Sequence, residues 1–148
     1  AMDIMRMESG FLHWGHDISP EENQYQAGLK FAISYKKNIN FVGKEALLKI
    51  KDQNPTKSLA MMVLKDNRPG EPLLLHEEPI YLDDKIIGRT TSGNYSFNFK
   101  KNISFGYVNS GNTIENLVNK NLSIEVEKKK YPVTIIKKPL NQKNIKDI

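Results

Sequence analysis

The sequence predicts an α+β segment followed by a small antiparallel β-barrel, and three observations lead to this fold class. Helix signals are confined to residues 1–55, whereas apolar residues alternate with a period of two from residue 59 onward. Turn-forming residues separate the alternating runs at short intervals. The polar stretch of residues 51–57 marks the best boundary between these two textures. We therefore expect one domain over residues 1–55 and a second over residues 56–148.

Three places in the first segment carry helix signals. Residues 2–10 predict a short helix that Gly10 ends, because glycine readily adopts the left-handed conformation of a helix C-terminus. Ser19 is an N-cap residue, and Pro20 after it suits the first helical position. Residues 42–50 have the spacing of an amphipathic helix.

Strands are predicted wherever apolar and polar residues alternate. One short strand is expected in the first segment, over residues 31–35. The second segment offers six candidates, with a short helix or a loop expected at residues 113–120. The six candidate strands are residues 59–64, 78–82, 85–92, 103–108, 122–127 and 131–137. Five or six such short antiparallel strands suggest a small barrel or a sandwich, and closure into a barrel removes their exposed edges.

The composition is that of an ordinary globular protein. Apolar residues make up 39% and charged residues 26% of the 148 residues, which is too apolar for a disordered chain. No apolar run approaches the roughly 18 residues that cross a bilayer, so we expect no membrane partner. Cysteine is absent, which excludes disulfides and a thiol nucleophile and agrees with a cytoplasmic location.

The net charge of +5 invites a nucleic-acid partner, but the kind of charge argues against it. Only three of the 22 basic residues are arginine, the residue whose planar fork matches phosphates and guanine edges. The strands also carry few aromatic residues for base stacking. We expect no nucleic acid among the partners.

The densest group of reactive side chains lies in residues 11–17. His13 and His16 with Asp17 could ligate a metal, but Gly15 interrupts any helix that would align the two imidazoles. A hydrolytic triad of Ser19, His16 and Asp17 fails because residues so close in sequence cannot act in series. We expect neither a metal nor a catalytic residue in this group.

Aromatic residues near the same turn leave two interpretations open. Phe11, Trp14 and Tyr25 could form a stacking wall for a flat heterocycle. Alternatively, they bury an apolar face between the two segments, and the residues alone favour this second interpretation.

Ordered motifs run through both segments, and together they carry a family resemblance. In the first segment these are Met5-Arg6-Met7-Glu8-Ser9-Gly10, His13-Trp14-Gly15-His16-Asp17-Ile18-Ser19-Pro20, Gln26-Ala27-Gly28-Leu29 and Phe41-Val42-Gly43-Lys44-Glu45-Ala46-Leu47. In the second they are Gly88-Arg89-Thr90-Thr91-Ser92-Gly93-Asn94-Tyr95-Ser96, Phe105-Gly106-Tyr107-Val108 and Lys137-Lys138-Pro139-Leu140. The sequence resembles the C-terminal portion of the glycine-cleavage aminomethyltransferase (T-protein) family. The stretch of residues 13–17 is more similar to the folate domain of dimethylglycine and sarcosine dehydrogenases.

The resemblance implies a fold, a chemistry and a cofactor. Residues 1–55 would end the folate-binding domain, and residues 56–148 would form the family's C-terminal β-barrel. The full-length parent would pass a methylene group from an amine to tetrahydrofolate, and a dehydrogenase would hold FAD in an upstream domain. Phe11 and Trp14 become the expected cofactor-binding residues, as an aromatic wall beside the pterin.

Other positions receive no catalytic role from the resemblance. Arg6 and Glu8 are expected in a structural salt bridge or cap. Near the C-terminus the family carries arginine where this chain offers only lysines such as Lys143 and Lys146, which lack the bidentate fork.

The resemblance also implies that the chain is a fragment. The family's catalytic aspartate lies upstream of the Arg6 motif, so we expect the chain to be inactive alone. Residues 1–55 cannot bury their apolar faces by themselves and are expected to pack on the barrel, on a missing N-terminal part, or on a second copy. The alternative from a different class is a complete small barrel that serves as an interaction module.

Overall fold

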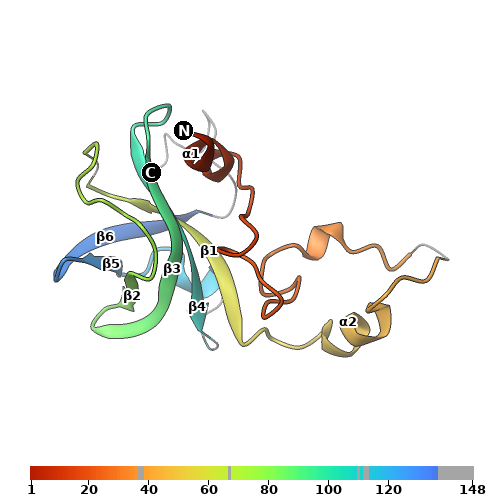
Figure 1. Cartoon of the computed structure of the whole chain (residues 1–148). Coiled ribbons are helices and arrows are strands. Elements are labelled where there is room, and N and C mark those ends of the chain that lie inside the picture. Colours follow the sequence, from red (N-terminus) through yellow and green to blue (C-terminus); the bar gives the residue numbers. More distant parts are fainter. Residues whose placement is uncertain (37–38, 67, 110, 112–113, 137–148) are drawn as a thin grey trace.

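The computed structural model describes residues 1–36, 39–66, 68–109, 111 and 114–136, and its centre is a closed six-stranded antiparallel barrel (Figure 1). Around the barrel the strands follow the order β1-β4-β3-β2-β5-β6. Their bounds are β1 Lys57–Leu64, β2 Pro79–Leu82, β3 Lys85–Ser96, β4 Lys101–Asn109, β5 Leu122–Val126 and β6 Lys129–Ile136. The predicted fold class is therefore confirmed, as are the positions of all six strands. Residue 137, the last of the expected sixth strand, lies outside the described residues.

Both faces of β1 are buried, which explains its unbroken apolar sequence. Ala60, Met62 and Leu64 belong to the main core, to which all six strands contribute. Val63, on the opposite face, belongs to a second cluster outside the barrel, with Leu59 packed against it. A helix covers this outer face, so β1 does not need polar residues there.

The helix α1, Met2–Glu8, closes the second cluster by burying Met7 completely against Val63, Ile103 and Phe105 (Figure 1). This helix agrees with the prediction for residues 2–10. Residues Ile114–Leu117 form a short helix, α3, so the structure selects the helix from the two alternatives at residues 113–120.

Glycines permit the closest contacts between strands. A Cβ atom added at Gly88 of β3 would lie 1.9 Å from the backbone oxygen of Tyr107 on β4. A Cβ atom at Gly106 would lie 2.6 Å from the oxygen of Arg89. The register between β3 and β4 shifts between Thr90 and Ser92, and such a bulge re-aims side chains at the edge of a barrel.

Two predictions in the first segment are wrong. Residues 31–35 do not form a strand, because Lys30–Ala32 is a single 3₁₀ turn, η1, and no neighbouring strand is available to pair with them. Ser19 does not start a helix, although its backbone and hydroxyl donate to Glu22 at 2.8 and 2.7 Å, as in a capping box. Here the box closes an isolated turn.

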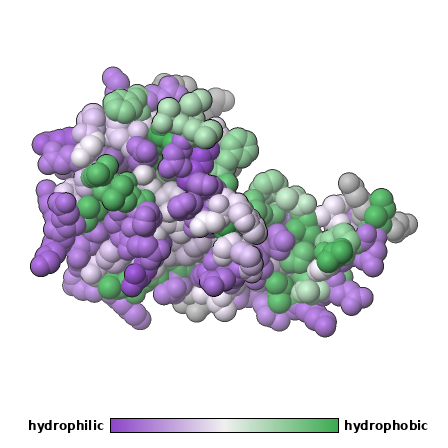
Figure 2. All heavy atoms as spheres, in the orientation of Figure 1, coloured by the Kyte–Doolittle hydropathy of each residue, from purple (hydrophilic) through white to green (hydrophobic). Residues whose placement is uncertain are grey.

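Residues 30–36 and 39–53, which we name the arm, extend away from the barrel (Figure 1). The arm carries the helix α2, Lys44–Ile50, which agrees with the prediction for residues 42–50. Leu47 is the only residue of this helix that is buried. Figure 2 shows apolar side chains exposed along the arm, and among them Val42 is fully exposed.

Candidate functional site

Residues 10–29, which we name the strap, connect α1 to η1 and cross the outer face of the barrel. Three polar anchors hold the strap there. The first is Asp17, the second is Glu22, and the third is Gln26, whose carbonyl accepts a hydrogen bond from the backbone of Leu59 at 2.8 Å. Asp17 lies in the motif of residues 13–20 and Gln26 in that of residues 26–29, so both motifs help to attach the strap to the barrel.

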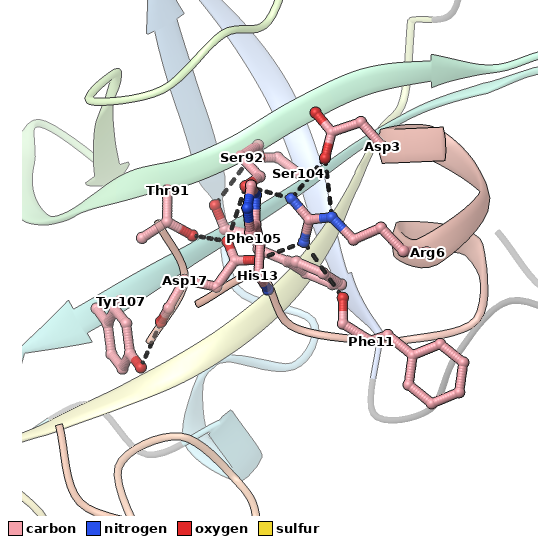
Figure 3. Close-up of polar contacts among 10 residues, drawn as sticks. All are labelled: Asp3, Arg6, Phe11, His13, Asp17, Thr91, Ser92, Ser104, Phe105 and Tyr107. Carbon is pink, nitrogen blue, oxygen red and sulfur yellow. Dashed lines mark hydrogen bonds and ion pairs between the residues drawn. The ribbon is translucent and has the colours of Figure 1, made fainter. Parts of the chain in front are cut away.

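Asp17 is fully buried, and both of its carboxylate oxygens are occupied (Figure 3). Oδ1 accepts hydrogen bonds from the hydroxyls of Thr91 at 2.5 Å and Ser92 at 2.8 Å, both on β3. Oδ2 accepts the backbone N–H of His13 at 2.9 Å and a charge-assisted hydrogen bond from Arg6. Each oxygen of this buried carboxylate therefore has two hydrogen-bond donors.

Arg6 brings α1 into the same network. Its guanidinium donates to Asp3 within the helix and to the hydroxyl of Ser92 at 2.8 Å, in addition to Asp17. It also donates to the carbonyl of Phe11 at 3.2 Å. Arg6 therefore has the structural role that was expected.

Glu8 does not share the ion pairs of Arg6. It accepts hydrogen bonds from Ser96 at the end of β3 and from Asn98 in the turn after it. Glu8 thus fastens the last turn of α1 to the barrel.

The backbone of Asp17 adds a contact to β4. The hydroxyl of Tyr107 donates to the Asp17 carbonyl at 2.9 Å. Burial raises the pKa of Tyr107 above its ordinary value, and the nearby carboxylates of Glu22 and Asp17 raise it further. Tyr107 therefore stays protonated and can donate throughout the neutral pH range.

The second anchor is an ion pair between Glu22 and Lys57 at the start of β1. The Lys57 ammonium also lies 4.9 Å from the centre of the Tyr107 ring. Burial acts to raise the pKa of Glu22, but hydrogen bonds and charge from Lys57 and Ser19 outweigh it, so the pKa lies below its usual value. Tyr107 therefore contacts two attachments of the strap: its hydroxyl bonds to Asp17, and its ring lies beside the Lys57 that pairs with Glu22.

The arrangement offers no support for metal or base chemistry in the residues 13–17 group. Within the ranges described above, no three histidine, cysteine, aspartate or glutamate side chains gather as metal ligands. The ring centres of His13 and His16 lie 4.5 Å apart with the planes tilted by 35°, and Asp17 faces inward and accepts only structural donors. Asp17 consequently has no free lone pair with which to act as a general base.

The two predicted cofactor-binding residues both lie on the outside of the strap. Phe11 is 69% exposed and Trp14 is 65% exposed, so neither fills the core. In Figure 3 the ring of Phe11 points away from the Arg6 network. This exposure contradicts, for Phe11 and Trp14, the alternative in which the three aromatics bury a face between the segments. Tyr25, the third, is half-buried, and its hydroxyl forms a hydrogen bond with that of Tyr35.

An open apolar groove of about 760 Å³ lies beside Phe11, between the strap and the barrel. Phe31 of η1 lines the groove as well, together with Met61 of β1 and Phe105 of β4. Trp14 does not line it, so the structure does not bring the two predicted residues into one pocket. Sequence reasoning missed Phe31, because residues 31–35 were predicted to form a strand and were not expected to lie beside the strap.

Sequence reasoning also missed Thr91 and Ser92 as partners of the strap. Their motif was recognised, but the contact joins residues 74 and 75 positions apart. Only the bulge at Thr90/Ser92, which alternation does not predict, points neighbouring hydroxyls toward one carboxylate. The expected C-terminal motif at residues 137–140 and the lysines at 143 and 146 lie outside the described residues.

The fold and the strap together define a class of protein: a closed antiparallel barrel whose outer face is crossed by an aromatic-bearing strap, which its own buried carboxylate, Asp17, fixes to the barrel. Residues 57–141 match the family described as "Glycine cleavage T-protein C-terminal barrel domain". The chain belongs to this family.

Relatives extend the similarity beyond the barrel. The chain is 33% identical to mitochondrial dimethylglycine dehydrogenase of Mus musculus over 142 residues, which cover 95% of this chain and 15% of that protein. It is 36% identical to an aminomethyltransferase of Symbiobacterium thermophilum over 108 residues, 73% of this chain and 28% of that protein. The chain thus spans well under a third of the length of these relatives.

A solved structure has the same fold. The glycine cleavage system aminomethyltransferase T of Bartonella henselae superposes with a TM-score of 0.78 at 21% identity, covering 93% of this chain and 37% of that one. The part of this chain that the structure describes contains no helix that is both long and apolar enough to span a membrane.

Proposed function

We propose that this chain forms the C-terminal part of an enzyme that transfers a one-carbon unit from an amine to tetrahydrofolate. The observation that carries the proposal is that the similarity to a dimethylglycine dehydrogenase runs through strap and barrel alike, over 95% of the chain. A fold match restricted to the barrel would support only a shared scaffold. FAD would belong to another domain of a dehydrogenase parent.

The strap supplies the proposed contact with the cofactor. Phe11 and Trp14 are exposed on a segment that three polar anchors hold rigidly on the barrel, and exposed aromatic faces suit the stacking of a pterin. The glutamate tail of tetrahydrofolate is anionic. The chain's excess of basic residues is compatible with it.

The chain alone is proposed to catalyse no transfer. Asp17 is the carboxylate beside the aromatic residues, and its oxygens are fully engaged by structural donors. A transfer step needs a carboxylate that is free to orient the donor amine or to move a proton. In the proposed enzyme that group comes from another part of the protein.

The arm is proposed to pack against another part of the same protein. Val42 and Ile39 are 103% and 72% exposed and line one open groove with Phe41, and an exposed apolar surface of this kind usually marks an interface. Relatives that match this chain along the arm are several times longer, which provides a partner in the same polypeptide. Self-association of the arm is the alternative. Sedimentation velocity over a range of concentrations separates the two, because only self-association gives a dimer of the isolated chain.

A chimera tests the proposed function directly. The aligned C-terminal portion of mouse dimethylglycine dehydrogenase is replaced by this chain, and the product formed from dimethylglycine and tetrahydrofolate is measured. We expect methylenetetrahydrofolate. We also expect the Phe11→Ala and Trp14→Ala chimeras to show a KM for tetrahydrofolate that rises roughly tenfold, by the loss of stacking worth about 1–3 kcal/mol.

Two results would contradict the proposal. The first is a folded chimera that still oxidises the amine but releases formaldehyde by hydrolysis of the iminium instead of passing the carbon to folate. The second concerns the isolated chain: a calorimetric titration with tetrahydrofolate should give weak binding or none, and tight binding would refute its dependence on the rest of the enzyme.

A further inference from the structure

We infer that Asp17 is a positioning residue: its carboxylate closes the turn at residues 13–18 and fixes that turn to β3, and this sets the place of Trp14. The inference deepens the proposed function, on which it rests in one respect, namely that Trp14 contacts folate. Its structural half, that Asp17 holds Trp14 in place, stands on the contacts alone.

The turn is closed by its own backbone. The carbonyl of His13 accepts hydrogen bonds from the N–H groups of His16 at 3.2 Å and Asp17 at 2.9 Å. Gly15 donates to the carbonyl of Ile18 at 2.8 Å, and its φ of +89° is one that residues other than glycine rarely adopt. Trp14 sits at the tip of this turn, in an isolated bridge with Ile18.

Apolar packing does little to hold the turn. Residues 13–16 are all exposed and Ile18 is only partly buried, which leaves Asp17 as the only buried residue of the turn. A segment without an apolar anchor depends on its polar contacts for its position.

The two carboxylate oxygens of Asp17 attach the turn to different elements. Oδ2 accepts from His13 N–H and from Arg6, so it joins the start of the turn to α1. Oδ1 accepts from Thr91 and Ser92, so it joins the end of the turn to the barrel. Asparagine has the same shape but no charge and only one acceptor oxygen, so its NH₂ group takes the place of Oδ1 and can only donate to the hydroxyls of Thr91 and Ser92. Replacing Asp17 by asparagine therefore removes the charge-assisted bond from Arg6 and weakens both attachments.

The experiment uses Trp14, which is the only tryptophan of the chain, as a local probe. Time-resolved fluorescence anisotropy measures nanosecond motion of its ring. In Asp17→Asn we expect the amplitude of that motion to rise by about twofold, while circular dichroism shows that the barrel is retained. In the chimera described above, the same variant should raise the KM for tetrahydrofolate with little change in kcat.

Glu22→Gln is the matched control, because it removes a carboxylate from another ion pair of the strap. It should leave the anisotropy of Trp14 unchanged. If Asp17→Asn does not fold, Ser92→Ala and Thr91→Val each remove one donor to Oδ1 and retain the ion pair with Arg6, and each should give a smaller increase in motion.

An unchanged Trp14 anisotropy in a folded Asp17→Asn variant, or equal mobility in the Glu22→Gln control, would overturn the positioning role. Failure of the proposed function looks different. In that case Trp14→Ala leaves the KM for tetrahydrofolate unaltered, although Asp17→Asn still loosens the tryptophan.

Discussion

The barrel and the arm are built from similar proportions of apolar residues but use them in opposite ways. In the barrel, the strands close on themselves and side chains such as Met62 and Ile124 are completely buried. In the arm, Val42 and Phe31 face solvent, and Leu47 is the buried residue of α2. The barrel buries its apolar side chains in its own core and under α1, whereas most of those on the arm remain exposed.

From this difference we expect the arm and the barrel to have different free energies of unfolding. A seven-residue helix such as α2 is marginal by itself, because helix nucleation is unfavourable and propagation adds little over two turns. The arm is held mainly by polar contacts, of which the 2.5 Å hydrogen bond between Tyr25 and Tyr35 is the most central. We therefore expect the arm to open locally without unfolding the barrel.

The largest effect is expected where the strap meets the barrel. Asp17→Ala leaves the partly buried guanidinium of Arg6 with only the exposed carboxylate of Asp3, and it removes the acceptor of the Thr91 and Ser92 hydroxyls. Removing one partner of a buried ion pair destabilises by about 3–5 kcal/mol. Urea unfolding followed by circular dichroism measures this change. A loss below about 1 kcal/mol would mean that the strap, like the arm, contributes little to the free energy of unfolding of the barrel.

Alanine substitutions at Gly88 and Gly43 test whether the barrel and the arm unfold separately, because Gly88 belongs to the barrel and Gly43 to the arm. A Cβ atom at Gly88 would overlap the backbone oxygen of Tyr107, so Gly88→Ala should lower the free energy of unfolding by about 3 kcal/mol. Gly43 has open space around it, and its φ of +86° makes alanine strained at the start of α2.

The matched variant Gly43→Ala should therefore affect only the arm. We expect hydrogen exchange to become faster in residues 44–50, while the unfolding free energy of the barrel changes by less than about 0.5 kcal/mol. A similar loss of barrel stability in both variants would show that the two regions unfold together.

The same contrast governs how much the sequence could predict. The six strands follow from alternation and turn residues, which are local signals, but their number alone suits a barrel or a sandwich. β1 was predicted together with the alternating runs, although both of its faces are buried and residues 59–64 are all apolar. In the strap the local signals misled, since the capping box at Ser19 closes a turn without a helix, whereas α2 in the arm was predicted correctly.

The candidate site was predictable only in part. Phe11 and Trp14 were selected from the motif, and their exposure agrees with a binding surface. The role of Asp17 was not predictable, because its partners Thr91 and Ser92 come from a distant strand and are aimed by a bulge. Long-range polar contacts of this kind leave no periodic signal in a single sequence.

Alkaline pH offers a smaller perturbation that acts on the arm first. Burial, the hydrogen bond with Tyr35 and the charge of Asp52 raise the pKa of Tyr25 to about 12. The unfolded value is about 10, so the folded state favours the neutral phenol. The contribution to stability is therefore complete below pH 10 and is lost as the pH rises toward 12.

Ultraviolet difference absorbance of the ionised phenol follows this titration. Tyr25→Phe should remove one late-ionising tyrosine, and Tyr35→Phe should shift that tyrosine to lower pH. If Tyr25 ionises with the bulk of the tyrosines in the native protein, the contact between Tyr25 and Tyr35 does not hold the arm in solution.

The smallest effect on stability is expected at Val42, which is the most exposed apolar residue of the arm. Val42→Ser removes no buried contact, so the free energy of unfolding should change by less than about 0.5 kcal/mol. If the arm packs against another part of the same protein, the same variant should weaken that contact, and amide hydrogen exchange of residues 44–50 in the chimera should become faster. A matched change at Leu75, an exposed leucine outside the arm, should affect neither quantity. Equal exchange rates in the two variants would mean that the exposed apolar surface of the arm has no specific partner, and the contrast between the barrel and the arm would then fail.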